Sequence, residues 1–146
     1  MKTSGFKLSN PTFLLDTNIL SSLIRQPAGP AAQKIAEVGP AACSTSIIVA
    51  CELRYGAVKK AAPRLTEKVD ALLEQLAVLP LETTIDRHYA TLRCELERRG
   101  QPIGANDQLI AAHALALNLT LVTHNTGEFC RVPNLRVENW LTAADR

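Results

Sequence analysis

The sequence has few aromatic residues: three phenylalanines, two tyrosines and one tryptophan among 146 residues. Stacking of many unpaired bases is therefore not an obvious mode of recognition for this chain. It also lacks an excess of one charge, because 16 Lys and Arg residues stand against 14 Asp and Glu residues for a net charge of +2. The composition therefore gives no sign of a large positively charged surface for nucleic acid, although basic residues can still cluster on one face.

The four cysteines lack the spacing of a metal site or a redox pair. Cys43, Cys51, Cys94 and Cys130 form no C-x-x-C pair and have no zinc-type spacing to a histidine. The start of the chain has no apolar signal core. We therefore expect reduced, mostly buried thiols in a cytoplasmic protein.

No hydrophobic stretch has the length of a membrane span. The apolar segment 13–24 is interrupted by Asp16, an asparagine and paired serines. A hydrophobic fraction of 47% in a chain of 146 residues allows one domain with a proper core. We expect that domain at 13–141, with a loosely ordered extension at 1–12 and a short tail at 142–146.

Hydrophobic periodicity divides the chain into alternating strands and helices. Short runs of apolar or small residues predict strands within 13–15, 39–46, 77–82, 120–123 and 135–140. Apolar residues at helical spacing predict helices at about 19–24, 31–38, 47–60, 65–76, 85–96 and 105–119. This alternation indicates an α/β fold with a mainly parallel sheet covered on both faces. Ligands in such folds bind at the carboxyl ends of the strands.

An acid follows the first expected strand, in the segment FLLDTN. Burying a lone carboxylate is unfavourable unless it is paired or bound to a cation, which favours a functional role for Asp16. A helix cap is the alternative, because Asp, Thr and Asn accept hydrogen bonds from free amides at a helix start. The segment alone does not decide between the two.

Glu52 lies on a helix stripe that the sequence predicts to be apolar. Its neighbours at i±3 and i±4 include Ile48, Val49 and Tyr55. Such a position suits a functional acid better than a solvating one. The alternative is a buried ion pair with Arg54 or Arg87.

Asp107 is the only formally charged residue between Gly100 and Glu128. An acid in a first helical turn also complements the helix dipole, typically by ~0.3–1 kcal/mol, so a structural role is open. If Asp16, Glu52 and Asp107 converge, their mutual repulsion opposes folding unless a cation neutralises them. Carboxylate ligands suit Mg²⁺ or Mn²⁺, which can polarise a phosphoryl oxygen and activate water for attack on a phosphodiester.

Four segments between Phe13 and Trp140 carry a family resemblance: FLLDTNIL, STSIIVACELRYGAVKK, IGANDQLIAAHALALNLTLVTHNTGEF and RVPNLRVENW. In this order they resemble PIN-domain ribonucleases, most closely the VapC-type toxins of bacterial toxin–antitoxin pairs. The resemblance implies a three-layer α/β/α PIN domain with a mainly parallel central sheet. It also implies an Mg²⁺- or Mn²⁺-dependent endoribonuclease that cleaves structured RNA, commonly transfer RNA or a ribosomal RNA loop.

The resemblance assigns the catalytic, metal-binding acids to Asp16 of DTN, Glu52 of ACELRYG and Asp107 of ANDQLIAAHAL. Many family members carry a further aspartate where this chain has Asn125, so Asn125 and Glu128 both remain open as the fourth site residue. The groups expected to hold the carboxylates in place are Thr17, Asn18, Ser46, Thr123 and Asn125. A helix cap is a sufficient alternative for Ser46.

The resemblance further implies a homodimer and a small VapB-type antitoxin that blocks the acidic site, often with a basic side chain. Any contact with DNA would then be made only by the antitoxin. Phosphate contacts of the RNA require cations, for which the candidates are Lys59, Lys60, Arg93, Arg98 and Arg99. Both adjacent pairs also suit a purely structural role at helix C-termini.

Two other classes of protein compete with the nuclease. One is a PIN-like module that binds RNA or a protein partner without cleavage, for which Asn125 is the best support. The other is a phosphotransfer domain with a phosphorylated aspartate, which in one family would require an acid two residues after Asp16. Asn18 stands there instead.

Overall fold

Five strands form one sheet in the order β3-β2-β1-β4-β5. The computed structural model describes residues 11–141, so most of the expected extension at 1–12 and all of the tail at 142–146 lie outside the described residues. Every adjacent pair of strands is parallel, which confirms the predicted α/β fold with a parallel sheet. The strands are β1 (Phe13–Leu15), β2 (Cys43–Ser46), β3 (Ala77–Leu79), β4 (Thr120–Val122) and β5 (Val137–Glu138).

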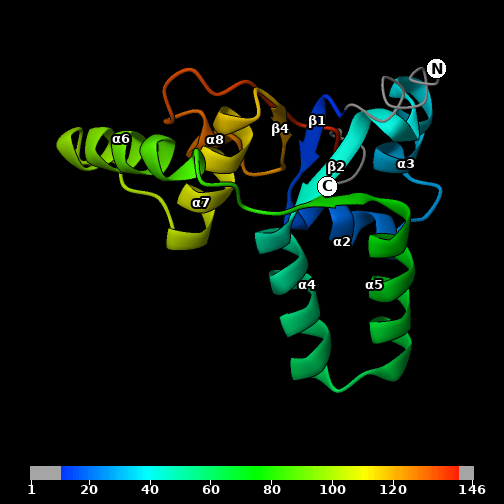
Figure 1. The fold of residues 1–146 in the computed structure, drawn as a ribbon. Helices are drawn as coiled ribbons and strands as arrows, with labels where there is room; N and C mark the ends of the chain where they lie inside the picture. The colour runs from blue at the N-terminus through cyan, green and yellow to red at the C-terminus, as the bar shows by residue number, and fades with distance from the viewer. Residues whose placement is uncertain (1–10, 142–146) are drawn as a thin grey trace.

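All six helices that the periodicity predicts are present (Figure 1). Two short elements were not predicted, because three or four residues are too few to show a helical period. The helices are α2 (Thr17–Arg25), α3 (Pro30–Val38), α4 (Ile47–Lys60), α5 (Pro63–Gln75), α6 (Ile85–Arg98), α7 (Ala105–Ala116), the short α8 (Thr126–Phe129) and the 3₁₀ helix η1 (Pro40–Ala42).

Local signals in the sequence fix where several helices begin and end. The Ser46 hydroxyl accepts a hydrogen bond from the Ile48 amide at 3.1 Å, so it caps α4 as the sequence allowed. Pro63 occupies the first turn of α5, where a missing N–H is harmless. Gly100 follows α6 with φ +68°, a left-handed conformation that glycine adopts without strain.

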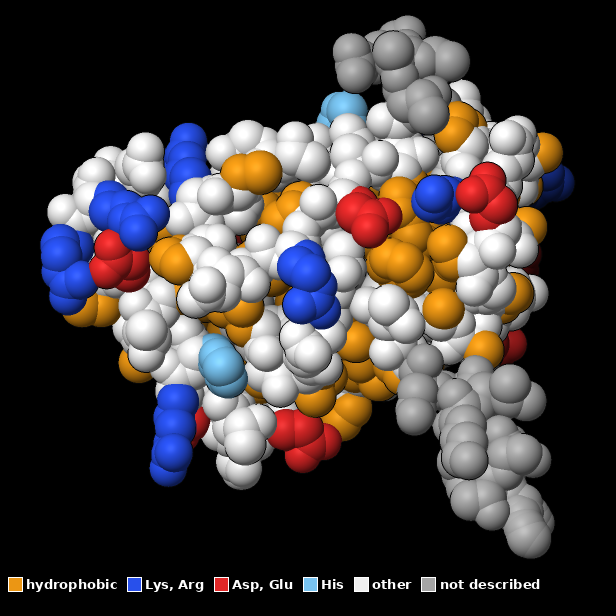
Figure 2. All heavy atoms as spheres, turned by 90° about the horizontal axis from the view of Figure 1, so that it is seen from above, with side chains coloured by type: hydrophobic (Ala, Val, Ile, Leu, Met, Phe, Trp, Pro, Cys, Tyr) orange, Lys and Arg blue, Asp and Glu red, His pale blue; other side chains and the backbone are white. Residues whose placement is uncertain are grey.

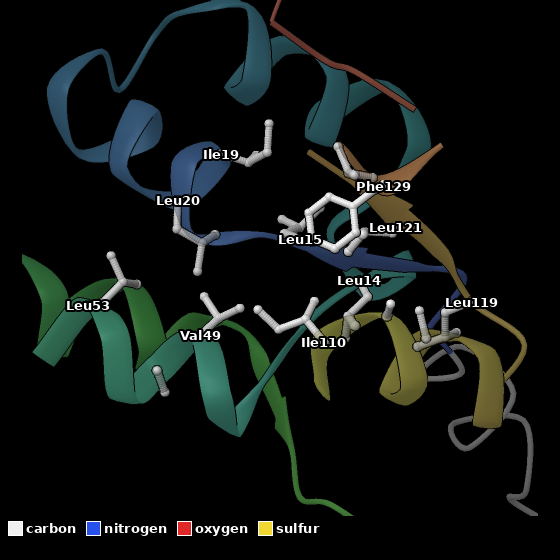
Figure 3. Packing of buried hydrophobic residues seen from close by; sticks show 14 of the residues in the cluster. Leu14, Leu15, Ile19, Leu20, Val49, Leu53, Ile110, Leu119, Leu121 and Phe129 are labelled. Carbon is white, nitrogen blue, oxygen red and sulfur yellow. The ribbon is translucent and has the colours of Figure 1, made fainter. Parts of the chain in front are cut away.

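The sheet lies between two layers of helices. Figure 3 shows α2 on one side of β1 and helices α4 and α7 on the other. Leu14, Leu15, Ile19, Val49 and Ile110 are fully buried between these layers. Helices α4 and α5 pack against each other as an antiparallel pair (Figure 1). No helix within residues 11–141 combines the length and apolar composition that crossing a membrane would need.

Trp140 packs in the core, with 4% of its surface exposed and its ring edge-on to Phe13 at 4.9 Å between centroids. The expectation of mostly buried thiols is wrong. All four cysteines are free, but only Cys43 is buried, and burial raises the pKa of its thiol to about 11. Cys51 and Cys94 lie on the solvent-facing sides of α4 and α6, where cysteine composition alone gives no warning of exposure.

The strand order creates one position where the chain reverses its direction across the sheet. From β1 the chain proceeds to β2 and β3 on one side, and it then returns to place β4 on the other side of β1. Helices therefore diverge from the carboxyl ends of β1 and β4, and the crevice between them is where open α/β sheets bind ligands. Asp16 follows β1 there, and Thr123 follows β4.

Candidate active site

A cleft of about 1030 Å³ opens at the carboxyl ends of β1 and β4. Its walls come from α2, α4, the start of α7 and the segment after β4. The three acids that the sequence marked, Asp16, Glu52 and Asp107, all line this cleft. These acids come from three separate places in the fold: Asp16 caps the start of α2, Glu52 lies on one face of α4, and Asp107 is in the first turn of α7.

Asp16 is both a helix cap and the most buried acid of the cleft, with 4% of its surface exposed. Its Oδ1 accepts a hydrogen bond from the Thr17 amide at 2.8 Å, and its Oδ2 accepts one from Thr123 Oγ1 at 2.7 Å. Burial raises the pKa of Asp16 most strongly, and the two hydrogen bonds oppose that rise. The charges of Glu52 and Glu128 raise this pKa further.

Glu52 is half-buried at the edge of the cleft, where it accepts hydrogen bonds from Thr17 Oγ1 and, at 3.2 Å, from Asn106 Nδ2. The prediction that Tyr55 shares a buried stripe with it is wrong, because the Tyr55 side chain is 65% exposed. At 100° per residue the buried stripe of α4 lies on the opposite side of the helix from Tyr55 and consists of Val49, Ala50, Leu53 and Ala57. The ion-pair alternative fails for Arg54, which pairs with Asp70.

Asp107 lies in the first turn of α7, and its pKa is raised to about 8. Burial is the main cause, followed by its interaction with Glu128 and then by the charges of Asp16 and Glu52. Glu128, in α8, stands beside Asp107, and their interaction lowers the pKa of Glu128. The two carboxyl groups therefore titrate as a pair, and their interaction raises the pKa of Asp107 and lowers that of Glu128.

The sequence left the fourth site residue open between Asn125 and Glu128, and each of them has one feature that such a residue would need. Asn125 lines the cleft, and a hydrogen bond with its side chain helps to lower the pKa of Glu128. Glu128 does not line the cleft, yet it has one buried oxygen, Oε1, without a hydrogen-bond partner. A buried carboxylate oxygen that lacks a donor is suited to a cation.

A small network ties the end of β4 to the start of α2. The Asn18 Oδ1 accepts a 3.0 Å hydrogen bond from the His124 amide, and the Thr123 hydroxyl accepts one from the Asn125 amide at 3.0 Å. His124 itself is exposed. Among the described residues, no hydrogen bond joins Ser46 to these acids: its oxygen accepts one from the Ile48 amide and lies 2.8 Å from His113 Nδ1, which fits a cap of α4.

The donor set of the cleft fits a hard divalent cation. Among residues 11–141, no three His, Cys, Asp or Glu side chains lie close enough together to hold an ion as they stand. Burial, and after it the charges of the neighbouring acids, raise the pKa values of Asp16 and Asp107, so a bound cation would offset the unfavourable charge of these carboxylates. Carboxylate oxygens and the unpartnered Glu128 Oε1 are the ligands that Mg²⁺ and Mn²⁺ prefer.

The cations proposed from the sequence do not line this cleft. Arg93 pairs with Glu97, and Arg98 and Arg99 both pair with Glu95, within α6. Figure 2 shows Lys and Arg side chains among Asp and Glu on the face that it presents, rather than one continuous basic surface.

The basic residue of the cleft is Arg25, which sequence reasoning missed together with Ser21, Asn106 and the exposed Tyr55. A signal was present for part of this set. Thr17, Ser21 and Arg25 recur at i, i+4 and i+8, which places a polar stripe on one side of an otherwise apolar helix.

Comparison with known proteins places the chain in context. The family model described as PIN domain matches residues 13–135. The Ribonuclease VapC2 of Rickettsia felis is 47% identical over 96 residues, which are 65% of this chain and 72% of that protein. The tRNA(fMet)-specific endonuclease VapC of Salmonella typhimurium is 37% identical over 129 residues, which are 88% of this chain and 97% of that protein.

Solved structures agree with this similarity. The crystal structure of DNA-bound VapBC from Salmonella typhimurium contains a chain that superposes with a TM-score of 0.84 and 36% identity. The match covers 89% of this chain and 98% of that chain. A chain in the structure of VapBC2 from Rickettsia felis, bound to a promoter DNA fragment, superposes with a TM-score of 0.80 at 39% identity, covering 88% and 98%.

Proposed function

The chain belongs to the PIN-domain family, and we propose that it is the ribonuclease toxin of a VapC-type toxin–antitoxin pair. The observation that carries this proposal is that Asp16, Glu52 and Asp107 line one cleft at the switch point between β1 and β4, with Glu128 beside Asp107. These acids come from four different elements, and they influence one another's protonation. Such clustering is unfavourable in folding and is therefore expected where it serves chemistry.

We propose Mg²⁺ or Mn²⁺ as the cofactor, held by Asp16, Glu52 and Asp107, with Glu128 completing the acidic set. When bound, this cation would place positive charge beside the scissile phosphate and activate water for in-line attack. The residues of the chain orient the ligands. Thr123 and the Thr17 amide fix both oxygens of Asp16, and Thr17 and Asn106 hold Glu52.

Protonation of Asp107 controls when the site is ready. Its pKa of about 8 means that the carboxyl is largely neutral at neutral pH before a cation arrives. Deprotonation of Asp107 completes the anionic ligand set, and Glu128 can accept a hydrogen bond from it until then. The cation and the proton thus compete for one position.

Transfer RNA is the substrate that we propose to test first. A relative that aligns over 97% of its own length is named a tRNA(fMet)-specific endonuclease. A ribosomal RNA loop is the competing target, and mapped cleavage ends distinguish the two.

A VapB-type antitoxin is the expected partner, because several solved relatives are VapBC complexes. An arginine of the antitoxin could pair with the uncompensated acids of the cleft and block access to it. We further propose a homodimer, DNA contact only through the antitoxin, and a cytoplasmic location. Three exposed free cysteines fit a reducing compartment.

The decisive experiment is cleavage of total bacterial RNA by antitoxin-free protein, with and without EDTA, followed by sequencing of the product ends. The Asp16→Asn variant removes one ligand charge with almost no change in volume. Asp86→Asn is its matched control, because Asp86 is exposed at the start of α6 and does not line the cleft.

We expect discrete cuts from the wild type and from Asp86→Asn, and no cuts from Asp16→Asn or in EDTA. RNA that is bound but left intact in both Mg²⁺ and Mn²⁺ would reject the enzyme. That result would favour the noncatalytic PIN-like module and would attribute the loss of activity to Asn125, which stands where many family members have an aspartate.

A further inference from the structure

The Tyr55 side chain stands out among the residues that line the acidic cleft. It is a large aromatic ring with 65% of its surface exposed, three residues after Glu52 on α4. The other tyrosine, Tyr89, packs partly against the hydrophobic core and accepts a hydrogen bond from Arg93. A single exposed apolar residue requires no explanation elsewhere on a surface, but this one is part of the wall of the site.

Arg25 occupies the wall formed by α2. It is the one Lys or Arg among the described residues that line the cleft, and within residues 11–141 it has no ion-pair partner. Helices α2 and α4 pack against each other, and Arg25 and Glu52 also share a smaller groove between them. An unpaired guanidinium in a cleft that three acids line is therefore available for an anion that enters the cleft.

The cleft is larger than the scissile linkage needs. Its volume of about 1030 Å³ is at the upper end of small-ligand pockets, which span roughly 300–1,000 Å³. The three acids, Tyr55 and Arg25 all line this one cleft. The space therefore accommodates a nucleotide next to the phosphate that reacts.

We propose that Tyr55 and Arg25 hold the RNA in this cleft, with an unpaired base beside the scissile linkage stacked on Tyr55 and a backbone phosphate bound by Arg25. This inference rests on the proposed ribonuclease function and names two substrate-binding residues of the same site. A base inside an A-form duplex is already stacked and paired, so it cannot lie flat on the ring. Lys59, whose ammonium lies 5.8 Å from the ring centroid, adds positive charge beside the same base.

The test measures binding separately from cleavage. Asp16→Asn protein in Mg²⁺ is titrated into a fluorescein-labelled 12-nucleotide RNA of mixed sequence, either single-stranded or as the duplex of the same sequence. Tyr55→Ala, Tyr55→Phe and Arg25→Gln are then introduced into this background. The matched controls are Val58→Ala, which is exposed on the same helix, and Arg64→Gln, which is exposed on α5.

We expect tighter binding of the single strand than of the duplex. Tyr55→Ala should weaken single-strand binding roughly 5- to 150-fold, the range for loss of one stacked base, while Tyr55→Phe and Val58→Ala retain it. Arg25→Gln should reduce the slope of log affinity against log salt by about 0.7, the value for one phosphate contact on a single strand, and Arg64→Gln should not. In the active protein, Tyr55→Ala should raise KM more than it lowers kcat.

Equal effects of Tyr55→Ala and Val58→Ala, equal affinity for duplex, or an unchanged salt slope in Arg25→Gln would each overturn the proposal. Unchanged RNA affinity together with weaker retention of a co-expressed antitoxin would also overturn it and assign both side chains to the protein partner. Failure of the ribonuclease function looks different. In that case the single strand is bound with the expected dependence on Tyr55 and Arg25, but the wild type cuts no RNA.

Discussion

Thr123 Oγ1 donates a 2.7 Å hydrogen bond to Asp16 Oδ2 across a separation of 107 residues. The two residues follow β4 and β1, which pair in parallel along their whole length. This hydrogen bond can form only after the sheet is assembled, so the orientation of the most buried acid depends on the long-range fold. The relationship makes Thr123 a positioning residue whose effect is measurable.

The Thr123→Val variant keeps the shape of the side chain and removes the hydroxyl. It leaves one Asp16 oxygen and the Asn125 amide without this partner, which should lower the free energy of unfolding by about 1–3 kcal/mol in urea denaturation. The hydrogen bond lowers the pKa of Asp16, so its loss should raise that pKa and move the acidic limb of the pH–activity profile to higher pH. Activity at neutral pH should fall roughly 10- to 100-fold.

Thr123→Ser is the control, because serine retains the hydroxyl and should restore the pH profile. A valine variant that is less stable but has an unshifted acidic limb would show that Thr123 supports the fold and not the Asp16 carboxylate.

The stability of the metal-free protein should depend on pH in an unusual direction. The pKa of Asp107 is raised from 3.8 to about 8 in the folded state, so between these values the folded protein retains a proton that the unfolded chain has lost. The contribution of Asp107 to the free energy of unfolding should therefore be fully present below about pH 4, decrease as the pH rises towards 8, and be absent above it. Asp16 contributes in the same direction, and Glu128 opposes it. Urea denaturation in EDTA across this range measures the slope.

Asp107→Asn should flatten that slope, because asparagine does not titrate. An equally steep decrease in the Asp107→Asn protein would assign the effect to other groups.

Metal binding should show the reciprocal dependence. A divalent cation must displace the proton of Asp107, so Mg²⁺ should bind more tightly as the pH rises towards 8 and should release protons in weakly buffered solution. The increase in melting temperature on adding Mg²⁺ should be larger at pH 8 than at pH 6. Similar increases at both values, with no proton release, would show that Asp107 does not exchange a proton for the ion.

Much of the fold could be predicted because its signals are local. Apolar periodicity and end signals such as Ser46, Pro63 and Gly100 located all six long helices. The alternation of strands and helices predicted the parallel sheet, and the position of Asp16 after the first strand placed the cleft. These signals depend on backbone geometry that neighbouring residues determine.

The remaining parts of the site depend on contacts that local patterns do not encode. Tyr55 is an example. Because the tyrosine was counted as apolar, the predicted buried face of α4 included a side chain that points to solvent. Arg25 was overlooked since only the packing of α2 against α4 brings it into the cleft. The interaction of Asp107 in α7 with Glu128 in α8 likewise joins two elements that are distant in the sequence, so no spacing within one helix predicts it.

The α4 helix contains a glycine whose replacement should stabilise the protein. Gly56 lies in the helix interior, and a Cβ added there would meet nothing within 4 Å. Gly56→Ala should therefore raise the free energy of unfolding by about 0.5–1 kcal/mol, because alanine has the higher helix propensity. Gly39→Ala is the contrasting control and should destabilise, since Gly39 has φ +94°. Destabilisation by Gly56→Ala would indicate that the groove between α2 and α4, which Gly56 lines, is narrower in solution, so that the added methyl group meets other atoms.

The fourth residue of the site can be identified by comparing Glu128→Gln with Asn125→Ala. Glu128 interacts with Asp107 and raises its pKa, so Glu128→Gln should lower that pKa and move the acidic limb of the pH–activity profile to lower pH. It should also reduce activity about 10- to 100-fold at the pH optimum, as loss of a group that supports metal ligands typically does. Glu74→Gln, a neutralised acid exposed on α5, should behave like the wild type. Asn125 acts on Asp107 only through Glu128, so Asn125→Ala should have the smaller effect. A larger loss from Asn125→Ala, with Glu128→Gln near the wild type, would transfer the role to Asn125 and leave Glu128 as a structural acid of α8.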